Sequence, residues 1–301
     1  MPEADKPARL AVGVVSAGRV GAVLGAALAR AGHTVVAAAG VSDASVRRAE
    51  NLLPGVELLP PDEVCRRADL VLLALPDDAL PGMVRGLAAA DALRAGQIVV
   101  HTCGAHGVDV LAPAADRGAL ALALHPVMTF TGRAEDLERL TTCCFGITAA
   151  DADETAWSVA EALVVEMGAE PVRVPPAARP LYHTALAHGA NHLVTLVAES
   201  ADLLRAAGVG EPDRMLGPLL SAALDNALRH GDRALTGPVA RGDAGTVRAH
   251  LRVLAEHAPD MLAAYRALAA RTADRAVASG LLRADLAPDV IAAIDEPGEE
   301  S

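Results

Sequence analysis

AVGVVSAGRVGAVLGAALARAGHTVV, at residues 11–36, is the stretch that decides the fold of this chain. An apolar run leads into a turn of small residues, and an alanine-rich helical pattern follows and ends at Gly32. A strand, a tight turn and a helix in this order are typical of the first unit of a dinucleotide-binding domain. The turn follows the pattern G-x-G-x-x-G except at its first position, where Ser16 replaces glycine.

The serine weakens this motif without removing its function. In the motif, the second glycine lets the backbone approach a pyrophosphate and the third lets the helix pack closely on the strand. Gly18 and Gly21 occupy those two positions. Ser16 has less backbone freedom than glycine, but its hydroxyl can donate to a phosphate oxygen, and the helix N-terminus attracts an anion. We therefore expect a pyrophosphate site formed by Ser16, Ala17, Gly18, Arg19, Val20 and Gly21.

Up to residue 174, short apolar runs alternate with helical patterns. Several runs are almost continuously apolar, as expected for parallel strands that are covered on both faces. The runs that predict strands are 9–15, 34–41, 69–75, 97–101, 119–124, 143–148 and 171–174. We predict an α/β fold with a Rossmann-type doubly wound parallel sheet at residues 9–175.

After Pro175 and Pro176 the pattern becomes helical throughout. The predicted helices are 179–207, 212–230, 243–254 and 258–279. They indicate an all-α C-terminal domain at residues 176–290, which we expect to serve in substrate binding and dimerisation. The acidic residues 291–301 have the composition of a disordered tail.

Composition excludes several classes of protein. The formal charge of the 301-residue chain is −12 and only five residues are aromatic, which argues against a nucleic-acid binder. No apolar stretch is long enough to span a membrane, and no secretory segment or C-x-x-C spacing is present. We expect a cytoplasmic protein with reduced thiols. Lys6 is the only lysine, so no lysine of the predicted core can serve in catalysis.

The end of the second predicted strand bears on the choice of cofactor. A carboxylate there usually holds the ribose hydroxyls of NAD, whereas hydroxyls and arginines suit the 2′-phosphate of NADP. This chain has Ser42, Asp43, Arg47 and Arg48 in this region. We predict NADP as the cofactor, while Asp43 leaves NAD possible.

Three predicted loops follow the carboxyl ends of neighbouring strands, where ligands bind in sheets of this class. The first contains Leu75, Pro76 and Asp77, the second Thr102, and the third His125. Thr102 is placed to orient the nicotinamide amide or a substrate carbonyl. Asp77 has the alternative role of capping a helix.

Five motifs carry a family resemblance: ALPDDAL at 74–80, VVHTCG at 99–104, LHPVMTFTG at 124–132, RPLYHTALAHGANHLVTL at 179–196 and ALTGPVARGD at 234–243. With them the chain resembles bacterial proteins that join a Rossmann-like domain to a helical domain of the DUF2520 type, within the wider 6-phosphogluconate dehydrogenase-like superfamily. The resemblance implies a nicotinamide-dependent oxidoreductase. Ser16 and Cys103 depart from the residues usual in the group.

The fourth motif supplies the candidates for proton transfer. Superfamily relatives have a lysine and an asparagine one helical turn apart here, and this chain has no lysine to offer. Histidine titrates near neutrality and can protonate a developing alkoxide. We place His183 first, because the Tyr182–His183 pair matches the motif of the group, and His188 second, with Asn191 on the same helix. These histidines have the alternative of purely structural roles.

The fifth motif offers Arg241 as an anchor for a substrate carboxylate, with the hydroxyl of Thr236 nearby. His125 and Tyr182 complete the predicted substrate site. His188 and His192 have the i,i+4 spacing of metal ligands, but no metalloprotease-type signature accompanies them, so we predict no metal.

The predicted reaction is hydride transfer from NADPH to the carbonyl, or alternatively the imine, of a small carboxylate substrate. Ketopantoate is the leading candidate by analogy with the superfamily. A nucleotide-binding sensor or scaffold without turnover is the alternative, since Ser16 and the missing lysine depart from the family pattern. The helix at 179–207 is apolar around much of its circumference, which predicts a homodimer.

Overall fold

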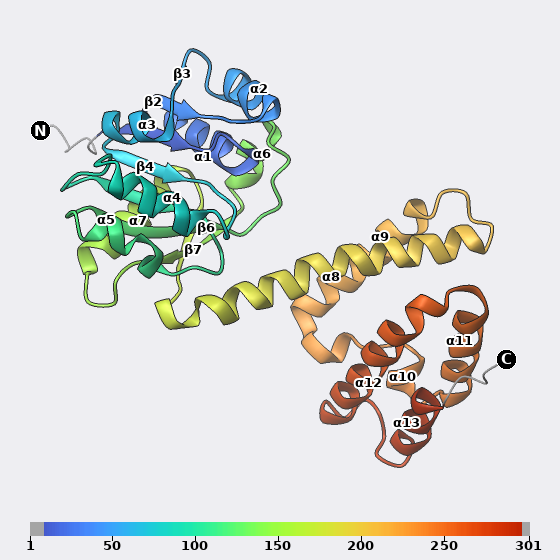
Figure 1. The fold of residues 1–301 in the computed structure, drawn as a ribbon. Coiled ribbons are helices and arrows are strands. Elements are labelled where there is room, and N and C mark those ends of the chain that lie inside the picture. Colours follow the sequence, from blue (N-terminus) through green and yellow to red (C-terminus); the bar gives the residue numbers. More distant parts are fainter. Residues whose placement is uncertain (1–8, 297–301) are drawn as a thin grey trace, which may run out of the picture. The chain divides into compact units, whose positions relative to one another are not determined.

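A computed structural model describes residues 9–296 of the chain. Its first part is built on one sheet with the strand order β3-β2-β1-β4-β5-β6-β7-β8 (Figure 1). The strands are β1 (Ala11–Val15), β2 (Thr34–Ala39), β3 (Glu57–Leu58), β4 (Leu70–Leu73), β5 (Ile98–His101), β6 (Leu120–Pro126), β7 (Cys144–Thr148) and β8 (Glu170–Arg173). All neighbours pair in parallel except β6 and β7.

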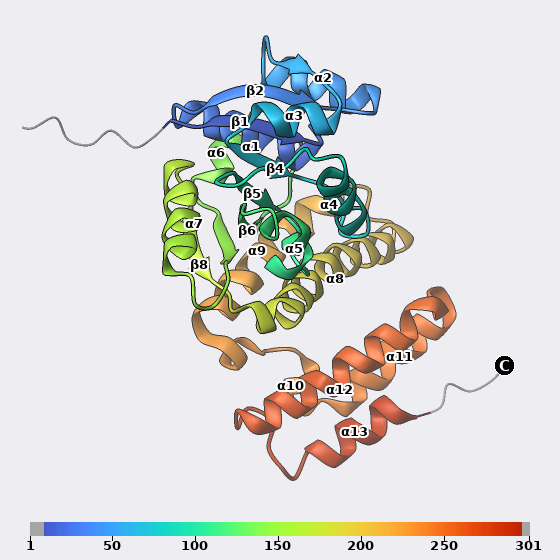
Figure 2. The ribbon, with the colours of Figure 1, turned by 60° about the vertical axis from the view of Figure 1, so that its left-hand side comes forward.

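Helices cover both faces of this sheet and account for its apolar strands. The side chains of β1 and β4 alternate between the faces: Val14 and Leu72 pack with α1 and α7, and Val15 and Leu73 pack with α3 and α4. Figure 2 shows α7 on one side of β5 and β6, and α4 and α5 on the other. The helices of this part are α1 (Arg19–Arg30), α2 (Asp43–Leu52), α3 (Pro61–Arg67), α4 (Leu80–Ala89), α5 (Ala112–Ala115), α6 (Glu135–Leu140) and α7 (Glu154–Glu166), with 3₁₀ turns at Val108–Leu111 and Pro176–Ala178.

The structure confirms the predicted doubly wound parallel sheet, with one antiparallel pair as the exception. β7 runs antiparallel to β6, with Ala123 opposite Thr148 and Pro126 opposite Phe145. The only helix between these strands is α6, whose six residues span about 9 Å. β7 starts at the edge where β6 ends and runs back beside it. The longer α7 then returns the chain so that β8 pairs in parallel with β7.

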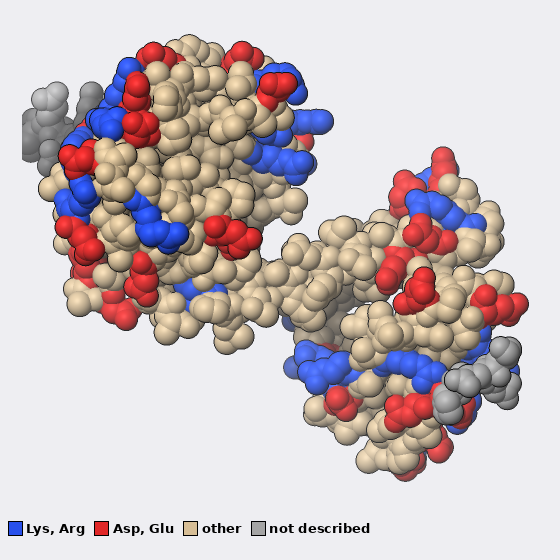
Figure 3. All heavy atoms as spheres, viewed as in Figure 1, with Lys and Arg blue, Asp and Glu red and all other residues tan. Residues whose placement is uncertain are grey.

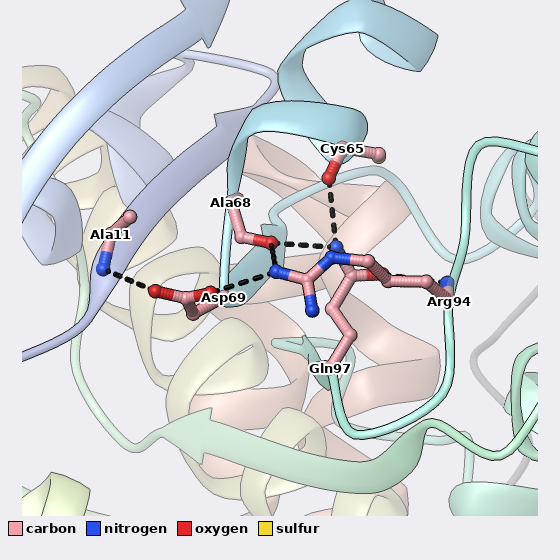
Figure 4. A network of polar contacts seen from close by, with 6 residues as sticks. All are labelled: Ala11, Cys65, Ala68, Asp69, Arg94 and Gln97. Carbon is pink, nitrogen blue, oxygen red and sulfur yellow. Dashed lines mark hydrogen bonds and ion pairs between the residues drawn. The ribbon is translucent and has the colours of Figure 1, made fainter.

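A buried glutamine closes the edge of the sheet opposite the carboxyl ends of the parallel strands (Figure 4). The Gln97 side chain is fully buried, and its Nε2 donates to the carbonyls of Cys65 at 2.7 Å and Ala68 at 2.8 Å. Arg94 also donates to the Ala68 carbonyl and pairs with Asp69. These contacts tie α3 to the starts of β4 and β5.

Replacing Gln97 with the similarly long but apolar Met should lower the free energy of unfolding by about 1–3 kcal/mol, because two buried carbonyls lose a donor. Arg94→Gln is the matched control, since the Arg94–Asp69 pair is half exposed and such pairs contribute about 1 kcal/mol or less. Urea unfolding monitored by circular dichroism measures both. If both variants lost the same free energy of unfolding, the buried hydrogen bonds of Gln97 would contribute no more than the half-exposed Arg94–Asp69 pair, which would contradict the prediction.

The chain divides into two compact units, residues 1–188 and 189–301, and the division falls inside α8 (Arg179–Ala206). The core of the second unit includes Val247, Leu251, Ala273 and Val290. The remaining helices are α9 (Asp213–His230), α10 (Pro238–Arg241), α11 (Ala244–His257), α12 (Leu262–Ala278) and α13 (Ala287–Asp295), with 3₁₀ turns at Gly231–Ala234 and Pro259–Met261. These elements confirm the helical C-terminal region.

The prediction of a disordered tail at residues 291–301 is wrong in its first half. Residues 291–295 complete α13, where Ala293 and Ile294 are buried in the second core. The apolar spacing of Val290, Ala293 and Ile294 is that of a helix face, and the acidic composition of the tail obscured it. Residues 297–301 lie outside the described part of the chain.

Candidate functional site

The carboxyl ends of β1, β4, β5 and β6 meet at one edge of the sheet, and hydrogen bonds link the loops that follow them. The N–H of Thr102, which is buried after β5, donates to the carbonyl of Leu73 at 3.2 Å. The thiol of Cys103 donates to the carbonyl of Leu75 at 3.3 Å. His106 contacts the carbonyl of Asp77 through Nε2 at 3.2 Å. The two loops therefore form one connected surface, with Pro76 exposed on it.

The turn after β1 has the geometry of a phosphate-binding loop. Ser16 has a φ of +76°, the left-handed conformation for which glycine is usual. A Cβ at Gly21 would lie 2.1 Å from the Ser16 carbonyl oxygen and 2.9 Å from Ala74, so only glycine fits there. At Gly18 the only atom near a Cβ would be the Ser16 hydroxyl, at 3.5 Å, which leaves room on this side of the turn. The N–H of Ala17 donates to Ala39 and fixes the turn to β2.

The N-terminus of α1 faces this turn without a side-chain cap or an acidic residue in its first turn. The first helical hydrogen bond runs from the N–H of Ala22 to the carbonyl of Gly18. The N–H groups of Arg19, Val20 and Gly21 therefore have no acceptor within the helix, and they suit an anion.

Ser16→Gly should raise the free energy of unfolding by about 1 kcal/mol, because a side chain in the left-handed region costs about that much. Ser42→Gly is the control: Ser42 has an ordinary φ of −90° and caps α2, so its loss should destabilise the protein by a few tenths of a kcal/mol. Thermal and urea unfolding of both variants provide the measurement. A destabilised Ser16→Gly protein would show that the serine side chain supports the turn.

Two arginines meet beside the loop that follows β6. A Cβ at Gly132 would lie 2.8 Å from Nε of Arg48 and 3.1 Å from Cγ of Arg19. Figure 3 shows basic side chains gathered over this corner of the sheet, where α2 and α6 lie. Arg47 is exposed, while the hydroxyl of Ser42 accepts from the N–H of Ser45 and caps α2. The arginine that the structure brings to Arg19 is thus Arg48.

A buried carboxylate holds the loop under these arginines. Asp136 is fully buried, and its Oδ2 accepts from the N–H groups of Thr131 at 2.8 Å and Gly132 at 2.7 Å. Its Oδ1 accepts from the Thr131 hydroxyl at 3.1 Å. Gly132 has a φ of +77°, so the loop needs glycine at this position. Asp136 therefore fixes the surface on which Arg19 and Arg48 rest.

Farther along the same edge, three aromatic side chains form a cluster. Nδ1 of His125 lies 2.8 Å from the hydroxyl of Tyr182, and the rings of His125 and His183 meet edge to face at 6.0 Å. Glycines make room for them, because a Cβ at Gly104 would lie 2.4 Å from His183 and one at Gly146 would lie 2.3 Å from the Tyr182 hydroxyl. The β5 loop, β6, β7 and α8 each contribute to this cluster.

Arg179, the first residue of α8, lies beneath the cluster and is fully buried. Its guanidinium donates to the carbonyls of Cys103 at 2.5 Å, Gly146 at 2.9 Å and His106 at 3.0 Å. Its charge also lies 5.3 Å from the centre of the Tyr182 ring. This one side chain joins α8 to the loop after β5 and to β7.

Burial sets the protonation of the groups around Arg179. It lowers the pKa of His125 to about 4, with Arg179 and His183 acting in the same direction and Asp77 opposing them. It lowers the pKa of His101 to about 3, so this histidine is neutral; its Nε2 contacts the Gly107 carbonyl and its Nδ1 accepts from the Cys103 N–H. Burial raises the pKa of the Cys103 thiol, which does not suit a nucleophile.

Other predicted residues belong to the second unit or to its boundary. His188 is the last residue of the first unit, and Asn191 belongs to the second, which begins at Gly189. Arg241 and Thr236 belong to the second unit, where Arg241 donates to the Thr236 carbonyl. Within residues 9–296, no three His, Cys, Asp or Glu side chains gather as metal ligands would, and no helix is long and apolar enough to cross a membrane.

Sequence reasoning missed three residues that shape this edge: Gly104, Asp136 and Arg179. It named Arg48 together with Arg47 but did not choose between them. Arg179 opens the motif RPLYH and Gly104 closes VVHTCG, so both stood in stretches that the sequence singled out. Nothing in the spacing indicates that Arg179 is buried or that Arg48, instead of Arg47, turns toward Arg19.

Two family models match the chain. One describes a Rossmann-like domain and covers residues 2–126, and the other describes a domain of unknown function, DUF2520, and covers residues 143–272. Both confirm the resemblance seen in the sequence. No functionally curated protein matches the chain.

Solved structures share the fold at low sequence identity. A proposed NADP oxidoreductase from Bacteroides fragilis is 22% identical with a TM-score of 0.72, over 88% of this chain and 98% of its own. A protein from Thermotoga maritima is 19% identical with a TM-score of 0.65, over 89% and 99% of the two chains. An imine reductase from a Pseudomonas species is 19% identical with a TM-score of 0.60, over 94% and 98%.

Proposed function

We propose that this chain, which joins a Rossmann-like domain to a DUF2520 domain, is an NADP(H)-dependent oxidoreductase. The observation that carries the proposal is the arrangement along the carboxyl edge of the sheet. The phosphate-type turn after β1 lies at one end of this edge, and the His125–Tyr182–His183 cluster lies at β6, three strands away. Strand spacing makes that separation about 14 Å, which suits an extended dinucleotide with its reactive ring at the cluster.

The residues present fit such a cofactor. The turn at Ser16–Gly21 and the uncapped α1 suit the pyrophosphate, and Arg19 with Arg48 suits a 2′-phosphate. Asp43, the first residue of α2, leaves NAD as an alternative. The proposed NADP oxidoreductase from Bacteroides fragilis and the imine reductase from a Pseudomonas species, which share the fold, support this class of reaction.

The chemistry divides between the bound cofactor and the chain's own residues. The nicotinamide supplies a hydride when bound. The cluster His125, Tyr182 and His183 then holds the substrate oxygen or nitrogen and exchanges a proton with it, with His183 the donor predicted from the sequence. Thr102 lies in the adjacent loop after β5, and Arg241 remains the predicted anchor for a substrate carboxylate. We propose a small carboxylate with a carbonyl or imine group as substrate, with ketopantoate the leading candidate.

Oxidation of NADPH in the presence of ketopantoate and a panel of other 2-keto acids tests this function. We expect a loss of absorbance at 340 nm that depends on the keto acid. If no oxidation is seen, the binding of NADPH and NADH, measured by calorimetry on the same protein, distinguishes a protein without catalytic activity from one without a dinucleotide site. Binding without turnover would favour a nucleotide sensor or scaffold, and no binding would refute the dinucleotide site.

Arg48→Ala should weaken NADPH binding about 10- to 100-fold and change NADH binding less than about 3-fold, because one charge-assisted bond to a phosphate is lost. Calorimetry with both cofactors gives the two values. Arg47→Ala is the matched comparison on the same helix, and we expect a smaller effect because Arg47 is exposed. A larger effect at Arg47 than at Arg48 would show that the wrong arginine has been placed at the 2′-phosphate.

We further propose that the chain is a homodimer. Large apolar side chains of α8 and α9 are exposed, among them Leu181, Val194, Leu219 and Leu228, the last at 80%. No charged residue stands between Arg179 and Glu199 of α8. Long helices with so much exposed apolar surface favour cover by another chain.

Light scattering at micromolar concentration should give a mass twice that of one chain. Val194→Glu should shift the mass toward that of the monomer, because it places a charge in the proposed interface. Arg85→Glu, at an exposed position of α4, is the control and should leave the mass unchanged. A wild-type protein with the mass of a single chain would refute the dimer.

A further inference from the structure

We infer that the site reduces a carbonyl in preference to a protonated imine, because the buried charge of Arg179 favours a substrate that gains negative charge over one that is already a cation. This inference rests on the proposed function and names its substrate class. It depends on three features: the burial of Arg179, its lack of an acidic partner, and its place beneath the proton-transfer cluster.

Arg179 is buried without a carboxylate to balance it. Its guanidinium donates only to backbone carbonyls, those of Cys103, His106 and Gly146. Among residues 9–296, no Asp or Glu lies within ion-pair distance of it, although 26 basic residues and 38 acidic residues make the chain strongly acidic overall. Carbonyl dipoles satisfy its hydrogen bonds but leave its net charge in place.

The charged and titratable groups around Arg179 leave this positive charge dominant. Asp77, in the loop after β4, is the acidic group that opposes it, and its influence on the pKa of His125 is smaller than that of Arg179. His125 and His101 are neutral near pH 7, with pKa values of about 4 and 3. The thiol of Cys103 and the phenol of Tyr182 keep their protons, because burial raises the pKa of both. The other titratable groups on neighbouring elements are His183, His106, Cys143 and Cys144.

The positive charge of Arg179 lies beside Tyr182, where carbonyl reduction and imine reduction develop different charges. In carbonyl reduction a hydride leaves NADPH, which becomes NADP⁺, a C–H bond forms on the substrate, and the π electrons of C=O move to oxygen. We take the Tyr182 hydroxyl, in place of the His183 predicted from the sequence, as the donor of the proton to this oxygen, because His125 and Arg179 both contact Tyr182. His125 Nδ1, 2.8 Å from that hydroxyl, can donate to the phenolate oxygen that remains. Arg179, 5.3 Å from the centre of the Tyr182 ring, stabilises this negative charge.

Imine reduction has the opposite requirement. A protonated imine enters as a cation, and hydride transfer to its carbon neutralises the nitrogen without further proton transfer. A buried guanidinium near the reacting atoms repels the iminium in the ground state. Stabilisation of that substrate would require an unpaired carboxylate in the place of Arg179. The charge that assists the carbonyl therefore disfavours the iminium.

A matched pair of substrates tests the inference. 2-Oxopentanoate and 1-pyrroline-2-carboxylate each have five carbons and one carboxylate, and they differ in the reacting group. The full-length protein is assayed with NADPH at a pH at which the pyrroline is protonated. We expect kcat/KM to be at least about 10-fold higher for the keto acid. A preference for the pyrroline would overturn the inference and leave the proposed oxidoreductase function intact.

Variants of Arg179 separate charge from folding. Arg179→Gln should lower kcat/KM for the keto acid about 10- to 100-fold and leave the pyrroline value unchanged or higher. Arg179→Lys keeps the charge and should restore most of the preference for the keto acid. NADPH binding and thermal unfolding show whether each variant is folded, and Arg85→Gln on α4 is the control. If the Arg179→Lys and Arg179→Gln variants have the same ratio of keto acid activity to pyrroline activity, the charge of Arg179 has no part in the selectivity.

If the protein binds NADPH but turns over neither 2-oxopentanoate nor 1-pyrroline-2-carboxylate, ligand binding tests the inference. In the presence of NADP⁺, 2-hydroxypentanoate should raise the unfolding temperature, and proline, the ammonium product, should not. Stabilisation by proline alone, or by neither compound, would overturn the inference. Failure to bind NADPH would instead refute the proposed function.

Discussion

The three hydrogen bonds of Arg179 hold the candidate site together. They bring the N-terminus of α8 against the loop after β5 and against β7, and they place Tyr182 over Gly146 and beside His125. No acidic side chain could make these contacts, since all three acceptors are carbonyls. The same arginine therefore provides both the position of the cluster and its positive charge.

The parallel sheet supplies the rest of the site. Because β1, β4, β5 and β6 run in parallel, their loops meet at one edge and need only short-range contacts to form a continuous surface. Asp136 and Gly132 shape one end of that edge, and Gly104 and Gly146 shape the other. At the opposite edge, Gln97 satisfies buried carbonyls and has no part in the site.

Local patterns predicted the first unit well. The apolar runs placed seven of the eight strands, and the turn at Ser16–Gly21 was identified from its glycines and the helix that follows. The two-residue β3 escaped notice because it buries no apolar side chain. The antiparallel direction of β7 could not be foreseen, because a strand's own residues do not indicate its direction. The connection before β7 (residues 127–143) is also about as long as the one before the parallel β6 (residues 102–119).

The side chains of the site were harder to predict. His125, Tyr182 and His183 were recognised as candidates, but their meeting depends on the pairing of β6 with β7 and on the position of α8, which are tertiary features. Arginine side chains are usually exposed, so nothing in the sequence indicated that Arg179 is a core residue. Likewise, the choice between Arg47 and Arg48 depends on the rotation of α2.

A crystal structure of the protein with NADP⁺ is the direct test of the proposed dinucleotide site. We expect the pyrophosphate at the Ser16–Gly21 turn, the 2′-phosphate within hydrogen-bond distance of Arg19 and Arg48, and the nicotinamide C4 facing the His125–Tyr182–His183 cluster. A nucleotide bound with its nicotinamide away from this cluster, or bound elsewhere on the chain, would contradict it.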